Sequence, residues 1–216
     1  MSHLKRQKAP KNWPIARKGT AYVVRPNSNI WKGIPILIIL RDMLKIVQNR
    51  KEAKRAITSK NVLHNNRIIK DEKNNAVLFD VIEIVPAKKH YRINLSALGK
   101  FALEKISEKE ANSKISKVID KKTMKGKKTQ VNLSDGRNFL TEIKCNTGDS
   151  VSINLKDRKI EKVLPLKENA KVIVFAGKHS GKTGTIRKLK LERKMVSISV
   201  GEEHINVLIK QIMVVE

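Results

Sequence analysis

Lysine and arginine are the residues whose number and spacing point most clearly to a chemistry. The sequence holds 47 of them against 20 aspartates and glutamates, a net charge of +27 over 216 residues. A chain with this imbalance repels itself on folding, and a polyanion is the simplest partner that compensates it. Lysines make up 35 of the 47, and lysine is a point charge without the planar fork of arginine. We therefore expect phosphate contacts rather than paired reading of base edges.

The candidate nucleic-acid-binding residues fall into an N-terminal group, a group around residues 41–67, a lysine run and a C-terminal loop. They are Lys5, Arg6, Lys8, Lys11, Arg17, Lys18, Arg41, Lys45, Arg50, Lys51, Lys54, Arg55, Lys60, Arg67, Lys121, Lys122, Lys125, Lys127, Lys128, Lys178, His179, Lys182 and Arg187. Aromatic residues form only 4% of the chain, so stacking on splayed bases cannot be the main mode of binding. The composition therefore favours contact with the phosphates of a polyanion, recognised by shape rather than by its bases.

Residues that could catalyse a reaction or hold a metal are scattered. The histidines are His3, His64, His90, His179 and His204, and none has the spacing of a zinc site. The single Cys145 can form neither an internal disulfide nor a Cys-x-x-Cys pair, which fits a reducing compartment. No serine, cysteine or carboxylate shows the spacing of a nucleophile with its base. We expect no catalytic residue, no metal and no cofactor.

A glycine-rich segment, Gly177–Thr183, has two alternative interpretations. It looks like the phosphate loop of nucleotide hydrolases, but three residues separate its first two glycines where that loop needs four. The residues that follow, Gly184–Arg187, are typical of a strand, whereas a phosphate loop must open a helix. The pattern from Val172 to Ile186, strand–Gly-x-x-x-Gly-x-x-Gly–strand, resembles the KOW motif of small SH3-like barrels in ribosomal proteins and transcription elongation factors. That resemblance implies a loop whose tip carries Lys178, His179 and Lys182.

The sequence shows no membrane span or secretory leader. Its longest apolar run, Ile36–Leu40, is five residues long, against about 20 for a bilayer. Its first eight residues lack the apolar stretch of a signal peptide. We therefore expect neither a membrane-spanning nor a secreted protein.

Residues 1–33 read as an extended basic arm. They carry eight cations, no acidic residue occurs before Asp42, and three prolines interrupt any long helix. An ordinary disordered tail is the alternative. Trp13 and Trp31 argue against a purely solvated tail, so we expect an arm that orders on its partner.

Residues 34–60 read as two helices. Pro35 suits a first helical position, and Leu37, Leu40, Leu44 and Val47 recur at helical spacing. Asn49 and Glu52 have the spacing of a capping box. In the second helix Ala53, Ala56 and Ile57 form the expected buried stripe, and Lys51, Lys54 and Arg55 the opposite, cationic face.

The next segments predict strands. Val62–His64 and Arg67–Ile69 flank Asn65-Asn66, a pair suited to a tight hairpin turn, and Val77–Ile84 is a further strand. Together, residues 34–84 resemble the small RNA-binding domain first defined in bacterial ribosomal protein S4. That resemblance implies that Arg41, Lys51, Lys54 and Arg55 grip structured RNA.

Residues 88–165 are expected to be rich in strands. Alternating apolar residues predict a strand at 91–95 and hairpins at 131–139 and 151–163. The segment 98–112 is either a helix or a strand followed by a short helix. The lysine run 121–128 is either a solvated loop or a phosphate contact. From 168 onwards, five short strands with intervening turns indicate a small barrel.

The order of these parts resembles the archaeal and eukaryotic small-subunit ribosomal proteins of the S4e family. The matching parts are the basic start His3–Arg6, Trp13-Pro14, the helical RNA domain, His90–Arg92, the β-rich middle and the terminal KOW barrel. The resemblance implies a non-catalytic role in the small subunit of a cytoplasmic ribosome, with ribosomal RNA and neighbouring ribosomal proteins as partners. For such a partner, the lysine-rich and aromatic-poor composition favours contact with phosphate and 2′-hydroxyl groups of folded RNA. Because the sequence ends directly after the barrel, we expect an archaeal rather than a eukaryotic form.

The predicted fold class is multi-domain α+β. We expect a basic N-terminal arm at 1–33, an S4-like domain at 34–86, a β-rich central domain at 87–166 and an SH3-like barrel at 167–216. Two alternatives are a non-ribosomal KOW regulator of transcription or RNA processing and an RNA-modifying enzyme. The enzyme would need a catalytic domain, and no remaining segment resembles one. A duplex-binding repressor would need a recognition helix rich in Arg, Asn and Gln, and none is evident.

Overall fold

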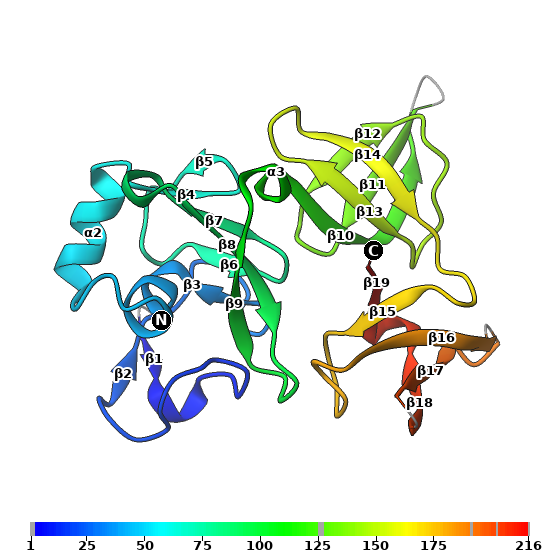
Figure 1. Cartoon of the computed structure of the whole chain (residues 1–216), viewed down its shortest axis with the longest axis horizontal. Helices are drawn as coiled ribbons and strands as arrows, with labels where there is room; N and C mark the ends of the chain where they lie inside the picture. Colours follow the sequence, from blue (N-terminus) through cyan, green and yellow to red (C-terminus); the bar gives the residue numbers. More distant parts are fainter. Residues whose placement is uncertain (1–2, 125–127, 191, 202, 216) are drawn as a thin grey trace. The chain divides into compact units, whose positions relative to one another are not determined.

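The computed structural model describes residues 3–124, 128–190, 192–201 and 203–215, which form two compact units (Figure 1). Unit 1 comprises the described residues up to Ser96 together with Lys100–Asn112. Unit 2 comprises Ala97–Gly99 and the described residues from Ser113 onwards. Each unit is described by itself below.

Unit 1 is built on an antiparallel sheet in the order β5-β4-β7-β8-β9, with two short strand pairs, β1-β2 and β3-β6. Its elements are β1 (Leu4–Lys5), the 3-10 turn η1 (Arg6–Lys8), β2 (Tyr22–Val23), β3 (Gly33–Pro35), α1 (Ile36–Ile38), the π-helix η2 (Ile39–Met43), α2 (Arg50–Thr58), β4 (Val62–His64), β5 (Arg67–Ile68), β6 (Asn75–Val77), β7 (Val81–Ile84), the 3-10 turn η3 (Val85–Ala87), β8 (Lys89–Leu95), β9 (Phe101–Ile106) and α3 (Glu108–Ala111). The expected boundary after residue 86 is wrong, because β8 pairs with β7 and belongs to this sheet. For residues 98–112, the alternative of a strand followed by a short helix is confirmed.

The first predicted helix is shorter than its apolar spacing indicates. Helical structure runs only from Ile36 to Met43, and Pro35 ends β3 instead of occupying the first helical turn. Leu37 and Leu40 are buried in the core as expected. Beyond the helix, Lys45 adopts a positive φ of 54°, a conformation that ends a right-handed helix. The repeat at Leu44 and Val47 therefore reflects burial of the following loop rather than a longer helix.

The second predicted helix is confirmed as α2. The side chain of Asn49 accepts a hydrogen bond from the Glu52 backbone N–H at 3.0 Å, and a Glu52 carboxylate oxygen accepts from the Gln48 N–H at 2.8 Å. These bonds satisfy backbone donors that a helix start leaves unpaired. Ala53 and Ile57 are buried beneath the helix. The capped helix thus presents its remaining face outwards.

The Asn65-Asn66 hairpin is confirmed, and both residues have positive φ, 51° and 58°, as a type I′ turn requires. Asp80, 2% exposed, fixes the turn. Its carboxylate lies 2.8 Å from His64 Nε2 and accepts from Asn65 Nδ2 at 2.7 Å and from the Val77 N–H at 2.7 Å. The Asn65 side-chain oxygen accepts from the Val81 N–H at 2.9 Å. Asparagine suits position 65 because it both donates and accepts.

The predicted continuous strand Val77–Ile84 is wrong. The chain forms β6 and β7 with a turn between them, in which Phe79 has a φ of +63°. The alternating apolar side chains gave no sign of this break. Asp80 supplies the physical reason, because its buried carboxylate bonds back to the Val77 N–H and closes the turn.

The predicted free arm is also wrong for the described N-terminal residues, which fold onto the core of unit 1. Trp13 is 2% exposed, and its indole N–H donates to the Gly33 carbonyl at 2.9 Å. Leu4 and Ala9 are buried in the same core, and the Phe101 N–H donates to the Asn12 carbonyl at 2.9 Å. Trp13 is thus an internal anchor. Trp31, 70% exposed, remains free for a partner.

Unit 2 contains two antiparallel five-stranded sheets, ordered β12-β11-β10-β13-β14 and β18-β17-β16-β15-β19. Its elements are β10 (Ser113–Thr123), β11 (Thr129–Leu133), β12 (Asn138–Thr141), β13 (Ser150–Asn154), β14 (Lys159–Leu164), β15 (Lys171–Val174), β16 (Thr183–Lys190), β17 (Met195–Val200), β18 (Glu203–Leu208), the 3-10 turn η5 (Ile209–Gln211) and β19 (Ile212–Val214). The predicted hairpins at 131–139 and 151–163 and the five C-terminal strands are present. Valine and isoleucine fill both cores, as expected for a chain with few aromatic residues.

A buried lysine links the two sheets of unit 2. The Lys117 ammonium, on β10, donates to the backbone carbonyls of Ile209 and, at 2.7 Å, Ile212, and lies 5.9 Å from the Phe175 ring centroid. Nearby, the Val214 N–H donates to the Ser150 hydroxyl at 2.9 Å. Burial lowers the pKa of Lys117 from 10.5 to about 8.

Replacing Asp80 with alanine should destabilise unit 1 by about 3 kcal/mol, because it leaves buried hydrogen-bonding groups around the hairpin unpaired. Both tryptophans of the chain lie in unit 1, so urea unfolding followed by tryptophan fluorescence isolates this transition. The control is Glu108→Ala, which removes an exposed carboxylate and should change stability by no more than about 0.5 kcal/mol. Equal effects of the two changes would contradict the role given to Asp80.

Lys117 should make unit 2 more stable as the pH rises from about 8 to 10.5. Its pKa is lower in the folded state, so over this range the unfolded chain binds more protons, and the gain is at most about 3 kcal/mol. The two carbonyl acceptors favour the ammonium and reduce this gain. Urea unfolding followed by circular dichroism, for the wild type and Lys117→Met, measures the difference. A difference in stability that does not change between pH 7 and 10 would refute the prediction.

Candidate nucleic-acid interface

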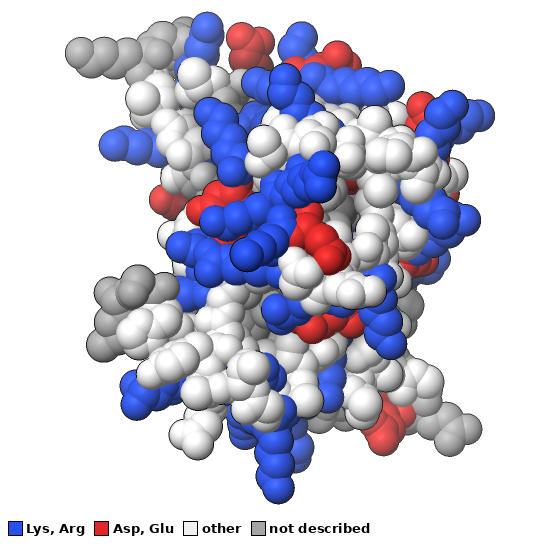
Figure 2. Space-filling model, turned by 90° about the vertical axis from the view of Figure 1, so that its left-hand side faces the viewer, with Lys and Arg blue, Asp and Glu red and all other residues white. Residues whose placement is uncertain are grey.

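The outer face of α2 is the clearest cationic surface of unit 1. The helix buries Ala53 and Ile57, so Lys51, Lys54 and Arg55 must project on the other side, where all three are exposed. Figure 2 views the molecule from the side on which α2 lies in Figure 1, and lysine and arginine side chains are spread over this face between uncharged residues. The arrangement suits an extended phosphate backbone, because the charges point outwards from one rigid helix.

A buried carboxylate fixes one edge of this helix. Glu72, 3% exposed, lies beneath α2 and accepts a hydrogen bond from Arg50 Nε at 2.8 Å. Lys54 Nζ lies 3.9 Å from the same carboxylate oxygen. The side chains of Arg50 and Lys54 remain 52% and 57% exposed. Glu72 thus holds Arg50 in place and lies within ion-pair distance of Lys54, while both cations still face solvent.

The other cations predicted around the helix pair differ in whether they are exposed or held in an ion pair. Arg41 is bound by both carboxylate oxygens of its neighbour Asp42, at 3.1 and 2.9 Å, and is part-buried. Lys45 and Lys60 are exposed at the ends of helical segments. Arg67 is exposed on β5. The fold therefore leaves Lys45, Lys60 and Arg67 exposed, whereas it holds Arg41 in an ion pair.

The N-terminal cations also comprise exposed side chains and one side chain that is bonded within the fold. Lys5, Lys8, Lys11, Arg17 and Lys18 are exposed on the folded segment. Arg6 is instead part of the fold, since its guanidinium donates to the Ala16 and Thr20 carbonyls and to the Thr20 hydroxyl. The predicted role of the segment as a charged surface stays open, but its shape is set by unit 1 rather than by a partner.

The first residues of the lysine run 121–128 belong to a strand rather than to a loop. Lys121 and Lys122 lie on β10, and the Lys121 ammonium donates to the Cys145 carbonyl at 3.1 Å. Lys122 and Lys128 are exposed. The predicted contacts of Lys125 and Lys127 lie outside the described residues.

The glycine-rich segment forms the predicted connection between β15 and β16 and opens no helix. Gly184 must be glycine, because a Cβ there would lie 2.2 Å from the Ser199 carbonyl oxygen of the paired strand. Lys178 is exposed, and Arg187 is exposed farther along β16. Lys182 donates to Glu203 at 2.7 Å, and this bond lowers the pKa of the carboxyl. One of the predicted phosphate contacts is therefore already paired.

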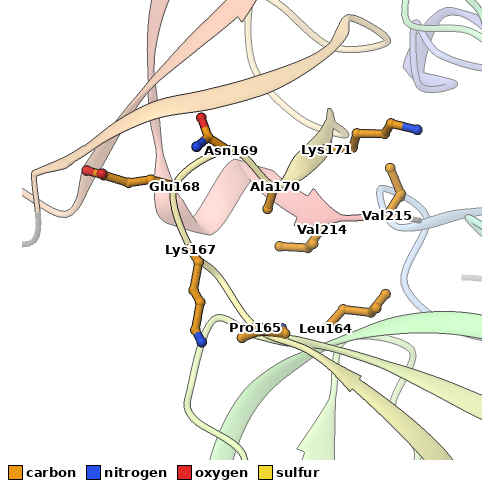
Figure 3. A pocket seen from close by; sticks show the side chains of 9 residues that line it. All are labelled: Leu164, Pro165, Lys167, Glu168, Asn169, Ala170, Lys171, Val214 and Val215. Atoms are coloured by element: carbon orange, nitrogen blue, oxygen red, sulfur yellow. The ribbon is translucent and has the colours of Figure 1, made fainter.

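Neither a metal cluster nor a helix long and apolar enough to cross a membrane occurs among the described residues. A cavity of about 340 Å³ in unit 2 is lined mostly by apolar groups. Figure 3 shows Leu164, Ala170 and Val214 turned toward it, while Glu168 and Lys171 extend away. The residues lining this cavity do not bring an acid and a base together, so it offers no catalytic arrangement.

A second cavity was not foreseen from the sequence. It has a volume of about 480 Å³ and lies in unit 1 between the N-terminal segment and the first helix, beside Arg6, Arg41 and Asp42. The one signal in the sequence is that Asp42 is the first acidic residue of the chain. Only folding of the N-terminal segment creates the cavity.

Comparison with known proteins gives concordant matches. A family model described as "Ribosomal family S4e" matches residues 87–160, and one described as "RS4NT (NUC023) domain" matches residues 2–28. The chain is 35% identical to "Small ribosomal subunit protein eS4" of Methanothermobacter thermautotrophicus over 88% of its own length and 80% of the relative's. The protein of the same name from Nanoarchaeum equitans is 36% identical, with 87% and 82% covered.

A solved structure also matches. The crystal structure of the 30S ribosomal protein S4e from Thermoplasma acidophilum superposes with a TM-score of 0.73 at 27% identity. The match covers 85% of this chain and 95% of that one. With relatives above 30% identity aligned over most of both chains, this protein belongs to the ribosomal protein S4e family.

Proposed function

We propose that this protein is a structural constituent of the small ribosomal subunit that binds folded ribosomal RNA. The cationic outer face of α2, held rigid by its cap and by Glu72, is the observation that carries the proposal. The relatives that share the sequence are named as small-subunit proteins. Neighbouring ribosomal proteins complete the set of partners, and the compartment is the cytoplasm.

The mechanism is contact with phosphate and 2′-hydroxyl groups. Lysine predominates among the cations, and lysine recognises a phosphate as a point charge. The exposed cations of α2, including Lys51 and Arg55, are accompanied by no asparagine or glutamine within the helix, so the helix lacks the amides that pair with bases. Neutralising adjacent RNA backbones lets them approach, which supports subunit assembly.

A sedimentation experiment distinguishes the proposed ribosomal role from the alternative, a non-ribosomal KOW regulator. A lysate with the tagged protein is run on a gradient at low magnesium, which separates the subunits. Stoichiometric presence in the small-subunit peak at moderate salt supports the proposal. Recovery at the top of the gradient or with polymerase-sized complexes would favour a regulator of transcription or RNA processing.

Removing two charges from the outer face of α2 should weaken RNA binding and its salt dependence together. The variant Lys51→Gln with Arg55→Gln loses two phosphate contacts, so the slope of log K against log[salt] should become shallower by about 1.4 to 1.8. Filter binding to small-subunit ribosomal RNA at several salt concentrations measures both quantities.

The matched control removes the same charge elsewhere. Lys156→Gln with Arg158→Gln alters two exposed cations in the turn between β13 and β14. We expect this pair to change the slope by less than about 0.5. If both double variants shift the slope equally, the α2 face has no special role and the protein binds RNA only through its overall charge.

Glu203→Gln should strengthen RNA binding if the loop between β15 and β16 meets RNA. The change releases Lys182 from its ion pair and makes it available to a phosphate. We expect an affinity gain of about two- to fivefold at low salt, screened as salt rises. The gain should vanish in the presence of Lys182→Gln. An unchanged affinity would show that this loop does not meet the RNA.

A further inference from the structure

The cavity of about 480 Å³ in unit 1 has the dimensions of a ligand site, since such sites range over about 300–1,000 Å³. The N-terminal segment closes it from one side and the first helix from the other. Its lining includes Ile15, Val23 and Ile38 together with Arg6, Arg41 and Asp42. Apolar walls therefore meet two guanidinium groups and one carboxylate.

The guanidinium of Arg6 is fixed as a planar wall of this cavity. Its Nε donates to the Thr20 carbonyl at 2.7 Å, and its terminal nitrogens donate to the Ala16 carbonyl at 2.7 Å and the Thr20 hydroxyl at 2.8 Å. Gly19, with a φ of +137°, passes so close that a Cβ there would lie 3.2 Å from Arg6 Cζ. A planar cation held on three sides is a surface on which a base can stack.

The carboxylate of Asp42 distinguishes between the parts of a nucleotide. A phosphate would be repelled by it, whereas the N–H groups of a base can donate to it. Arg41 occupies one acceptor position on each Asp42 oxygen, at 3.1 and 2.9 Å, and a carboxylate offers about four. The Asp42 side chain is 30% exposed, so acceptor positions remain within reach of a ligand.

We propose that this cavity receives one unpaired guanine base of the bound RNA, an inference that rests on the proposed function. Guanine carries two adjacent donors on its Watson–Crick edge, N1–H and the N2 amino group, and a carboxylate can accept from both. The O6 and N7 acceptors of the base suit the N–H donors of Arg41 that Asp42 leaves unused. Ile15, Val23 and Ile38 supply apolar contact, and Lys18 at the rim meets the phosphate of the same nucleotide.

The footprint of the full-length protein on its small-subunit ribosomal RNA tests the inference. Kethoxal, which reacts with N1 and N2 of unpaired guanine, is the probe. We expect one guanine to be protected by the wild type and to react again with Val23→Phe, which fills the cavity without changing any charge. Affinity should fall about tenfold in this variant, because one stacked base is lost. Its salt slope should become shallower by no more than about 0.9, the share of the single phosphate contact made by Lys18.

Two further variants keep the test decisive. Asp42→Asn preserves the volume of the side chain but replaces an acceptor with a donor. Changing the protected guanine to adenine should cost the wild type about tenfold in affinity and this variant less than twofold. Arg17→Gln, the charge control, lies outside the cavity lining and should reduce the salt slope while leaving the guanine protected.

The outcomes separate the inference from the proposed function. An RNA that does not bind the wild type at all refutes the proposed function and the inference with it. Binding in which no guanine is protected, or in which Val23→Phe and Asp42→Asn leave the protection and the guanine preference intact, overturns the inference alone. Protection of an adenine in the cavity would likewise refute the choice of guanine.

Discussion

Charge repulsion is the constraint on which the rest of this structure depends. A chain with 47 cations and 20 carboxylates must bring positive side chains close together when its small aliphatic cores form. The buried carboxylates lie at the points where loops close onto these cores. Glu72 ties α2 to the loop before β6, Asp80 closes the hairpin, and Asp135 pairs with the buried Lys114 at 2.6 Å. A few acids, rather than large apolar cores, thus fix the loops.

The same pairs determine which cations remain available to a partner. Arg50 and Lys54 lie next to one buried carboxylate at the edge of α2 yet stay half-exposed. Their outward-facing N–H groups therefore remain accessible to a phosphate. Lys182 is paired with a surface glutamate, Glu203, at 2.7 Å. A partner must displace that glutamate, whereas it meets Lys51 and Arg55 directly. The helix that carries these cations is already folded, so no backbone freedom is lost on binding, which favours recognition of a preformed RNA shape.

The N-terminal segment shows how folding changes the meaning of a basic sequence. Its cations and prolines are typical of a free arm, but Trp13 is buried and bonded to Gly33. One indole, placed in a core made of isoleucine and leucine, contributes more apolar contact than any neighbour could. The segment then contributes walls to a cavity in unit 1. A basic surface that is already shaped can discriminate among RNA structures, which a flexible arm cannot.

The sequence by itself determined the β-rich architecture, the capped α2 with its cationic face, the Asn65-Asn66 turn and the strand-to-strand glycine segment. These features depend on local spacing, cap chemistry and turn residues, which short stretches of sequence contain. Only the tertiary structure decided the burial of Trp13, the break between β6 and β7, the place of β8 in unit 1 and the pairing of Arg6, Arg50 and Lys182. The reason is that a side chain's partner can lie far away in sequence, as Lys117 and Ile212 do, and its charge alone does not show which carboxylate or carbonyl it will meet.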